Sequence, residues 1–521
     1  MKIKISILLL AVGLLSVSCA DFLDVNEDPN NPTEVTPDLV LPVGLNYTAD
    51  YVGSNRRLNH LGNMMMFNFG ESQGFNWYRD EFKYSVTTTF YSALFNDAYS
   101  RAMKQYEVLT DQSDEYAYYQ AIGKIMKAYH FQILVDLFGK VPYENALGRK
   151  KNITPEYEDG DVIYEAILDS LTSANNLIES TNPTTAEAVG EEDVVYGGDM
   201  LKWEKFANTL KIRILTRLSD KKDASFINGE LDKIDMEVGF IEDDVGVNPG
   251  YMAEEKNKQN PYWNDLGMDD SGDITLTHRA TCATQFVVNY FQETGDPRLG
   301  YIFGPSEDNG DFSGINQGAE NEDKETQAPE KISILNLSYK DVDAYGGKSE
   351  EELAEPQGVL RGPEADLTIM TLAEHYLNMA ELANKGLHVD KSAEDYYHEG
   401  IKASFAYLMG GDYEEDIAED YYNQSIENVS WSGSNNKIDA IMTQKWLATM
   451  GINAAQSWFD YNRTGYPSGK PVTSGQFPVS EMASTDDRPV RLMFPSSETS
   501  RNASNVPEQP DVFNNPIFWA N

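Results

Sequence analysis

Cysteine is scarce in this chain: two of its 521 residues are cysteine, Cys19 and Cys282. A framework of several disulfides is therefore excluded, and with it the class of small secreted domains that such frameworks stabilise. We assign Cys19 to lipid attachment below, which leaves Cys282 without a disulfide partner. The fold must be stabilised by packing, and a chain of this length can bury a sizeable core.

Positive charge is also scarce. Lysine and arginine total 41 residues against 84 aspartates and glutamates, which gives a formal net charge of -43. Nucleic acids and anionic lipid surfaces are bound by clustered cations that displace counterions, so this balance disfavours both as partners. It favours a neutral or cationic ligand. Alternatively, the charge serves only to keep the protein soluble at a crowded cell surface.

Signatures of catalysis are missing too. The sequence has no G-x-S-x-G elbow, no H-E-x-x-H pair, no G-x-x-x-x-G-K-[ST] loop and no G-x-G-x-x-G turn that opens a helix. Its six histidines lack metal-ligand spacing, and the acidic loop 269–273 lacks the terminal glutamate of an EF-hand. We therefore expect no catalytic residue, metal site or cofactor, with a calcium ion in the acidic loop 269–273 as the alternative. A surface glycoside hydrolase remains an alternative, because sequence cannot reveal the separation of a carboxylate pair.

The most informative feature that is present lies at the N-terminus. Two lysines precede an apolar run, residues 5–17, which is too short to span a bilayer and is followed by Cys19. The pattern predicts a signal peptide over residues 1–18 and a mature chain that begins at a lipid-modified Cys19. The alternative is an ordinary secretory signal with Cys19 incidental, since Ser16 stands where most lipoprotein signals carry leucine.

Helical periodicity dominates the rest of the chain. Residues 19–42 are rich in Asn, Pro, Asp and Thr without a period, so we expect them to form a lipidated tether. Residues 43–521 are expected to form one all-α domain of tetratricopeptide-like helix pairs with long loop insertions, because apolar residues recur at helical spacing. The predicted helices are 88–110, 115–138, 161–179, 200–218, 281–294, 364–385, 392–409, 437–450 and 452–461.

The long polar connections 238–273, 304–330 and 338–363, and other loops, contain aromatic residues. An exposed aromatic ring stacks on the apolar C–H face of a sugar, while neighbouring Asn, Asp and Arg side chains bind the sugar hydroxyls. We therefore nominate loop aromatics as ligand-binding residues, with the alternative that each ring pins its loop onto the core. The candidates are Phe75, Trp77, Tyr78, Tyr262, Trp263 and Trp431.

Several blocks then make the chain recognisable. The most characteristic is YHFQILVDLFGKVPYENAL at 129–147, and others follow over nearly the whole mature chain: WEKFANTLKIRILTRLS from Trp203, DPRL from Asp296, MTLAEHYLNMAEL from Met370, IMTQKWLATM from Ile441, SWFDYNRTGYP from Ser457 and RLMFPSSE from Arg491. Together these blocks resemble the SusD/RagB family of Bacteroidetes outer-membrane lipoproteins. The opening DFLDVNEDPNNPT from Asp21 resembles the subgroup most divergent from the starch-binding prototype.

The resemblance implies a non-enzymatic lipoprotein on the outer-membrane surface that captures a glycan and delivers it to a SusC-like TonB-dependent transporter. A peptide is the alternative ligand, because parts of the family serve peptide importers. Arg213, Arg217, Arg463 and Gly465 lie in matching blocks and carry over as scaffold residues. The family's ligand-binding aromatics lie in divergent loops, so the six candidates rest on loop chemistry alone.

Overall fold

The computed structural model describes residues 36–148, 152–319, 327–337 and 356–520, and the statements below concern this part of the chain. Cys19, the predicted signal peptide and residues 19–35 of the predicted tether lie outside the described residues. Within the described ranges, no helix combines the length and apolar character needed to cross a membrane.

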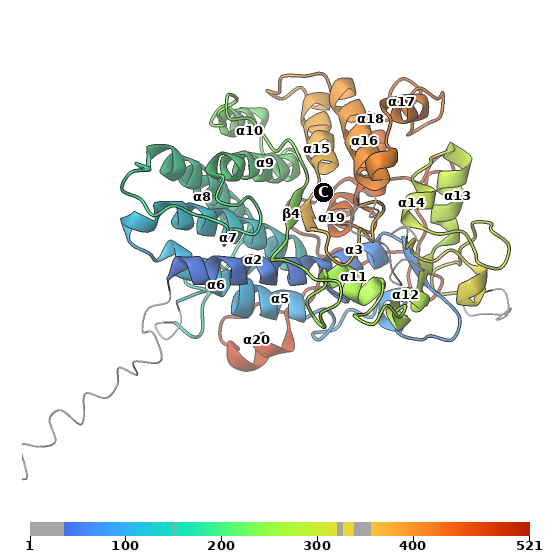
Figure 1. The fold of residues 1–521 in the computed structure, drawn as a ribbon, viewed down its shortest axis with the longest axis horizontal. Helices are drawn as coiled ribbons and strands as arrows, with labels where there is room; N and C mark the ends of the chain where they lie inside the picture. Colours follow the sequence, from blue (N-terminus) through green and yellow to red (C-terminus); the bar gives the residue numbers. More distant parts are fainter. Residues whose placement is uncertain (1–35, 149–151, 320–326, 338–355, 521) are drawn as a thin grey trace, which may run out of the picture.

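Two blocks of packed helices form the scaffold (Figure 1). In the first block, neighbouring helices pack in chain order from α6 to α9, with α2 lying against α6; in the second, α15 packs on α16 and α18. Helix α15 also packs on α9 and so joins the blocks. The prediction of an all-α scaffold of helix pairs is confirmed. These helices are α2 (Pro37–Gly53), α6 (Met103–Thr110), α7 (Ala117–Phe138), α8 (Gly160–Ser180), α9 (Met200–Leu218), α15 (Leu372–Asn384), α16 (Ala393–Met409), α18 (Lys437–Thr449) and α19 (Ala455–Thr464).

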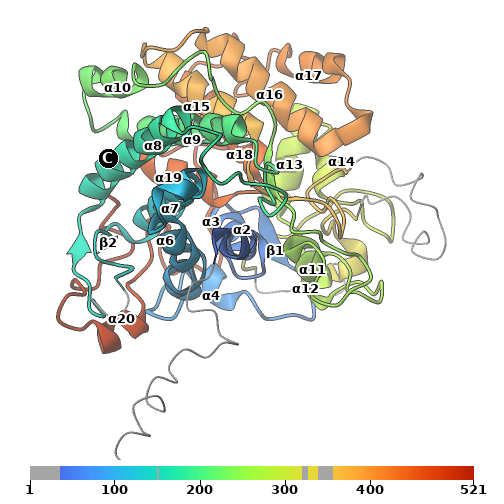
Figure 2. The same ribbon diagram turned by 60° about the vertical axis from the view of Figure 1, so that its left-hand side comes forward.

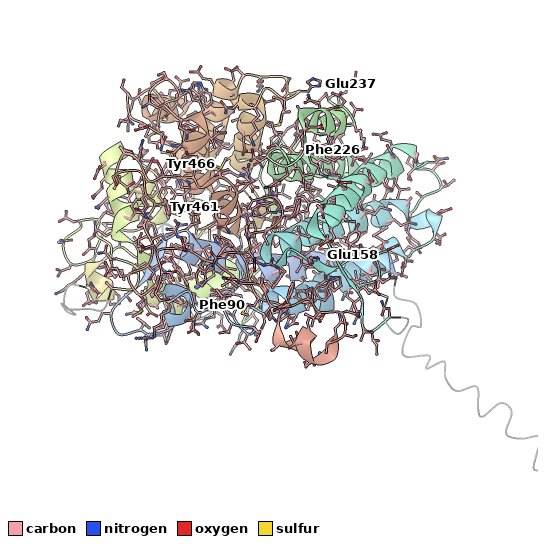
Figure 3. The ribbon with its side chains drawn as sticks, turned by 180° about the vertical axis from the view of Figure 1, so that it is seen from behind. Phe90, Glu158, Phe226, Glu237, Tyr461 and Tyr466 are labelled. Atoms are coloured by element: carbon pink, nitrogen blue, oxygen red, sulfur yellow. The ribbon has the colours of Figure 1, made fainter. Side chains whose placement is uncertain are left out.

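Shorter elements lie between and beside the scaffold helices (Figure 2). Seen from behind, side chains fill the spaces between the ribbons (Figure 3). The short helices are α3 (Leu58–Met65), α4 (Arg79–Phe82), α5 (Ala93–Asp97), α10 (Ala224–Leu231), α11 (Pro261–Leu266), α12 (Leu276–Ala280), α13 (Gln285–Thr294), α14 (Leu299–Ile302), α17 (Glu415–Tyr422) and α20 (Ser496–Arg501). The strands pair antiparallel as β1 (Phe69–Glu71) with β5 (Thr281–Ala283), β2 (Val141–Pro142) with β3 (Tyr157–Glu158), and β4 (Val245–Val247) with β6 (Leu367–Met370).

The boundary predicted for the tether is wrong at its C-terminal end, because α2 already begins at Pro37. Proline suits the first position of a helix, where its missing N–H leaves no hydrogen bond unmade. Leu41 and Leu45 are fully buried, so residues 37–42 belong to the helical body and not to a tether.

Two predicted helices, 281–294 and 364–385, start later than expected because short strands precede them. The hydroxyls of Thr284 and Thr371 accept hydrogen bonds from the N–H groups of Val287 and Glu374, which caps α13 and α15 at those threonines. The residues before each cap are buried strands, β5 and β6. A strand that is buried on both faces lacks the alternation of apolar and polar residues that marks a half-buried strand. The hydrophobic pattern alone therefore assigns the residues of β5 and β6 to the helices that follow them.

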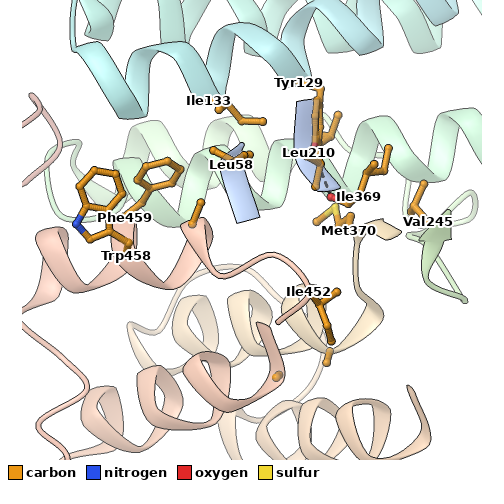
Figure 4. Packing of buried hydrophobic residues seen from close by; sticks show 14 of the residues in the cluster. Leu58, Tyr129, Ile133, Leu210, Val245, Ile369, Met370, Ile452, Trp458 and Phe459 are labelled. Carbon is orange, nitrogen blue, oxygen red and sulfur yellow. Dashed lines mark hydrogen bonds between the residues drawn. The ribbon is translucent and has the colours of Figure 1, made fainter. Parts of the chain in front are cut away.

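The core runs between the two helical blocks. Figure 4 shows Tyr129 of α7 and Leu210 of α9 beside Ile369 of β6, while Trp458 and Phe459 of α19 lie at the other end of the same cluster. In the same cluster, the Tyr129 hydroxyl donates to the Ile369 carbonyl of β6 at 3.2 Å. The packing therefore ties the strand segments to the helical scaffold.

Several charged residues in the core are paired. Arg213 holds both carboxylate oxygens of Glu374 at 2.7 and 2.9 Å, and Arg463 holds both oxygens of Glu381 at 2.6 and 2.7 Å. Gly465 ends α19 in the left-handed region at φ 74°. Arg213, Arg463 and Gly465 therefore have structural contacts of the kind expected for scaffold residues.

Candidate functional site

The six nominated aromatics lie in three places. Phe75, Trp77 and Tyr78 belong to the loop between β1 and α4. We call this loop together with the first residue of α4, residues 72–79, the aromatic loop. Tyr262 and Trp263 are the second and third residues of α11. The sixth, Trp431, lies between α17 and α18.

Trp77 presents the most open ring of the six. The residue is 40% exposed, and Phe75 packs against its ring edge to face with ring centroids 4.9 Å apart. Next to this pair, an Arg79 guanidinium nitrogen (Nη1) donates to the Asn76 side-chain carbonyl at 3.2 Å. The aromatic loop therefore offers apolar ring surface beside planar hydrogen-bonding groups.

The backbone of Trp77 is held by two charged side chains. Its N–H donates to Glu71 Oε1 at 2.5 Å, and its carbonyl accepts from Arg56 Nη2 at 2.5 Å. The Tyr78 N–H donates to the same carboxylate oxygen at 3.2 Å. Because Glu71 is the last residue of β1, these bonds close the aromatic loop back onto the strand.

Tyr78 faces inward, although the sequence nominated it as a ligand-binding residue. It is 1% exposed, its ring lies 5.0 Å from that of His60, and its hydroxyl hydrogen-bonds Thr281 of β5 at 2.9 Å. Burial raises the pKa of its hydroxyl, so Tyr78 stays neutral. Tyr78 anchors the aromatic loop while its neighbour Trp77 points outward.

Tyr262 and Trp263 are also buried, at 6% and 1% exposure. The Asn260 side chain accepts from their N–H groups at 2.8 and 3.1 Å, and Pro261 occupies the first position, which together start α11. Both rings line a cavity of about 20 Å³ that also touches Tyr407. Such a space admits a water molecule and not a sugar.

The turn between α2 and α3 joins the aromatic loop to α11. Asn55 donates its N–H to the Asp265 carboxylate at 2.6 Å, while the next residue, Arg56, reaches the carbonyl of Trp77. Ser72 donates its N–H to the Ala280 carbonyl at 2.9 Å, which places α12 beside the aromatic loop. The fold thus brings all the nominated aromatics except Trp431 into one region, around the turn between α2 and α3.

Trp431 lies apart from the other five. It packs against Tyr397 of α16 with ring centroids 5.3 Å apart, and Lys437 of α18 places its ammonium 4.9 Å from the indole. Helices α16 and α17 lie at the top of Figures 1 and 2, whereas α11 and α12 lie near the bottom. Its half-buried ring already has a cation over it, which leaves less face for a ligand.

Two clefts contain residues that the sequence did not single out. One of about 430 Å³ and an adjoining one of about 410 Å³ share Asp243, Asp244, Arg361 and Tyr407, and the first also contains Asp366. The Arg361 guanidinium lies 4.2 Å from the centre of the Tyr407 ring and donates to its backbone carbonyl at 2.6 Å. Asp243, Asp244 and Arg361 fall in two of the long polar connections, whereas Tyr407 lies on α16, and only the fold shows that they meet.

Among the described residues, no group of three or more His, Cys, Asp and Glu side chains is placed to hold a metal ion. In the acidic loop 269–273, the Asp269 carboxylate instead accepts from the backbone N–H groups of Ser271 and Asp273 at 2.9 and 3.0 Å. These bonds shape a turn.

The chain is similar in sequence to one protein family and in fold to several solved structures. A family model described as SusD-like, starch-binding and associating with the outer membrane matches residues 29–495. A SusD homolog from Bacteroides uniformis is 20% identical with a TM-score of 0.69, covering 92% of this chain and 99% of that chain. A chitin-binding SusD homolog from Flavobacterium johnsoniae is 18% identical with a TM-score of 0.71, covering 92% and 98%.

A SusD homolog from Bacteroides thetaiotaomicron gives 19% identity and a TM-score of 0.69, covering 93% of this chain and 99% of that chain. A comparison with proteins of curated function found no match. At these identities the solved structures establish the fold, and the family model covers most of the sequence. The protein therefore belongs to the SusD-like family, whose members are binding proteins and not enzymes.

Proposed function

We propose that this protein is a lipid-anchored lipoprotein on the outer-membrane surface that captures a glycan and delivers it to a SusC-like TonB-dependent transporter. Membership of a family described as starch-binding and associating with the outer membrane supports this proposal. So does the similarity to a chitin-binding homolog, whose fold this chain shares.

The observation that carries the proposal is the exposed ring of Trp77. A sugar ring has an apolar C–H face that an indole covers well, and its hydroxyls need planar hydrogen-bonding partners. Phe75 widens the apolar surface, and Asn76 and Arg79 supply an amide and a guanidinium beside it. Tyr78, Tyr262 and Trp263 act in this proposal as the buried support of the site.

Affinity electrophoresis through gels that contain chitin derivatives, starch or other polysaccharides identifies the glycan, and calorimetry then measures its affinity. Trp77→Ala should weaken binding at least about tenfold, which corresponds to about 1.4 kcal/mol. Leu201→Ala is the matched control, because Leu201 is an exposed apolar residue on α9, 50% exposed and outside the aromatic loop. This control should leave the affinity unchanged.

Trp431→Ala tests whether the glycan binds at the aromatic loop or in the region around Trp431. If it abolishes binding while Trp77→Ala does not, the site lies between α16 and α18 and the proposal for the aromatic loop fails. If no glycan in the panel binds to the protein alone or with its transporter, the glycan proposal itself fails.

A cationic peptide is the second candidate ligand. The acidic clefts around Arg361 favour it, because Asp243 and Asp244 line both clefts, Asp366 lines the larger one, and the chain as a whole carries a charge of -43. Binding of a lysine-rich peptide that falls steeply with salt and is lost in Asp243→Asn/Asp366→Asn would support this alternative. Trp77→Ala should leave peptide binding unchanged.

A further inference from the structure

Both backbone polar groups of Trp77 are held by side chains of opposite charge. We propose that Glu71 and Arg56 are positioning residues that fix the Trp77 ring as a preformed stacking surface for the ligand. This inference rests on the proposed function, because Trp77 is the residue proposed there to stack on the glycan. Glu71 and Arg56 do not themselves stack on the sugar but position the residue that does. We call Glu71 and Arg56 the charged clamp.

The carboxylate half of the clamp is set by the β1–β5 pairing. Glu71 lies opposite Thr281 in that ladder, so its backbone position is fixed by a strand and not by the loop. Its Oε1 accepts from the N–H groups of Trp77 and Tyr78, which have no strand partner. Bonds from two backbone N–H groups to one carboxylate are charge-assisted and define the direction in which the loop leaves the strand.

The guanidinium half is set by the α2–α3 turn. Arg56 has a left-handed backbone at φ 53°, a conformation that L-residues adopt only when their surroundings impose it. Its neighbours are bonded on both sides: Asn55 to Asp265, and Arg57 to Asp97 through an ion pair of 2.8 Å. The turn is therefore held in place before Arg56 reaches the Trp77 carbonyl.

The clamp does not merely attach the loop to the body, because Tyr78 already does so. Its buried ring packs on His60 and Phe82, and its hydroxyl bonds Thr281. What Glu71 and Arg56 add is control of the residue before it, whose side chain is exposed. A ring held in its bound orientation avoids the entropy cost of ordering when a ligand arrives.

A double-mutant cycle tests this role with the glycan that retards the wild-type protein in affinity gels. Glu71→Ala and Arg56→Ala should each weaken binding about three- to tenfold in the wild-type background, which is the cost of ordering one large side chain. In a Trp77→Ala background the same changes should alter the affinity less than about twofold, because there is no ring left to position. Glu71→Gln should retain most of the affinity, since its amide oxygen still accepts.

Acrylamide quenching of tryptophan fluorescence gives a readout that needs no glycan. The contribution of Trp77 is the difference between each protein and the same protein with Trp77→Phe, and it should change in Glu71→Ala and Arg56→Ala. Equal weakening in both backgrounds, or unchanged Trp77 quenching, overturns the clamp. Changed quenching in a protein that binds no glycan supports the clamp and refutes the proposed function, so the two failures are distinguishable.

Discussion

Individual charged residues have two different environments in this protein. Inside the scaffold, Arg217 on α9 donates to the Asp136 carboxylate of α7 at 2.7 Å, and both side chains are at most 1% exposed. The Trp519 indole N–H donates to the same carboxylate at 2.8 Å, which ties the C-terminal segment into this pair. At the surface, Arg101 and Asp50 form a pair of 3.3 Å with 46% and 35% exposure.

These two pairs should differ sharply in their effect on stability. Arg217→Met should lower the free energy of unfolding by about 3–5 kcal/mol, because it leaves the Asp136 carboxylate buried without its cation. Arg101→Met, the matched control, should change it by less than about 1 kcal/mol, because water screens an exposed pair. Chemical denaturation of both variants measures the difference. A similar loss in both would contradict this assignment of the buried pair.

Glu204 gives the stability a dependence on pH. It is 6% exposed on α9, and burial, with the Glu179 and Asp235 carboxylates nearby, raises its pKa to about 7. In the unfolded chain a glutamate has a pKa of about 4.3. Between about pH 4.3 and pH 7 Glu204 is therefore protonated in the folded state and ionised in the unfolded state, so the free energy of unfolding falls as the pH rises.

Glu204→Gln should therefore raise the melting temperature relative to wild type at pH 8, and this advantage should disappear near pH 4, where both forms are neutral. Thermal unfolding at several pH values measures it. A difference that does not vary with pH would show that Glu204 is not the titrating group.

At the level of the elements, helices α3 and α19 cross with their backbones in close approach. A Cβ on Gly62 would lie 2.0 Å from the Ala455 nitrogen and 2.3 Å from the Ala454 carbonyl carbon. These are backbone atoms, which cannot move aside as the end of a side chain can. Glycine at this position is therefore what lets α3 lie against α19.

Gly62→Ala should destabilise the protein by at least about 1–3 kcal/mol, the usual cost of overpacking. Gly229 in α10 is the matched control, because a Cβ there meets nothing within 4 Å. Gly229→Ala should stabilise by about 0.5–1 kcal/mol, since alanine is the better helix former. Urea unfolding of the two variants gives the comparison, and a tolerated Gly62→Ala would contradict the close crossing.

The sequence predicted the long helices well, because their apolar period persists over many turns. Residues 200–218 match α9 at both ends. It missed α2 because Pro37 and Pro42 read as breaks, whereas tertiary packing on α6 keeps the helix intact. Short elements such as α3 and β6 carry too few residues for a period to be recognised.

The candidate site was predictable only in part, for a physical reason. Trp77 and Tyr78 are adjacent aromatics in the same polar loop, yet one is 40% exposed and the other 1%. Which ring points outward depends on contacts with Glu71, Arg56 and Thr281, which come from other elements. Loop composition indicates that aromatic surface is present, and tertiary contacts decide which ring a ligand can reach.

At the scale of the whole molecule, the proposed function requires attachment to the membrane at one end. The predicted lipid site, Cys19, lies outside the described residues, and the described body begins with α2 at Pro37.

Cys19→Ser should move the protein from the membrane fraction to the soluble fraction and abolish uptake, because the lipid is the proposed anchor. The glycan affinity of the purified protein should not change. Cys282→Ser is the control, since Cys282 is fully buried and should not affect membrane attachment. Cell fractionation with an uptake assay measures both variants. Loss of glycan affinity in Cys19→Ser would show that the anchor does more than tether.

A crystal structure of the full mature chain with the glycan identified by affinity electrophoresis would show whether Trp77 is the surface that binds the sugar. We expect a sugar ring stacked on the indole of Trp77, with its hydroxyls bonded to Asn76 or Arg79 and the bonds from Glu71 and Arg56 to the Trp77 backbone intact. A sugar bound instead against Trp431, or in the acidic clefts around Arg361, would contradict it.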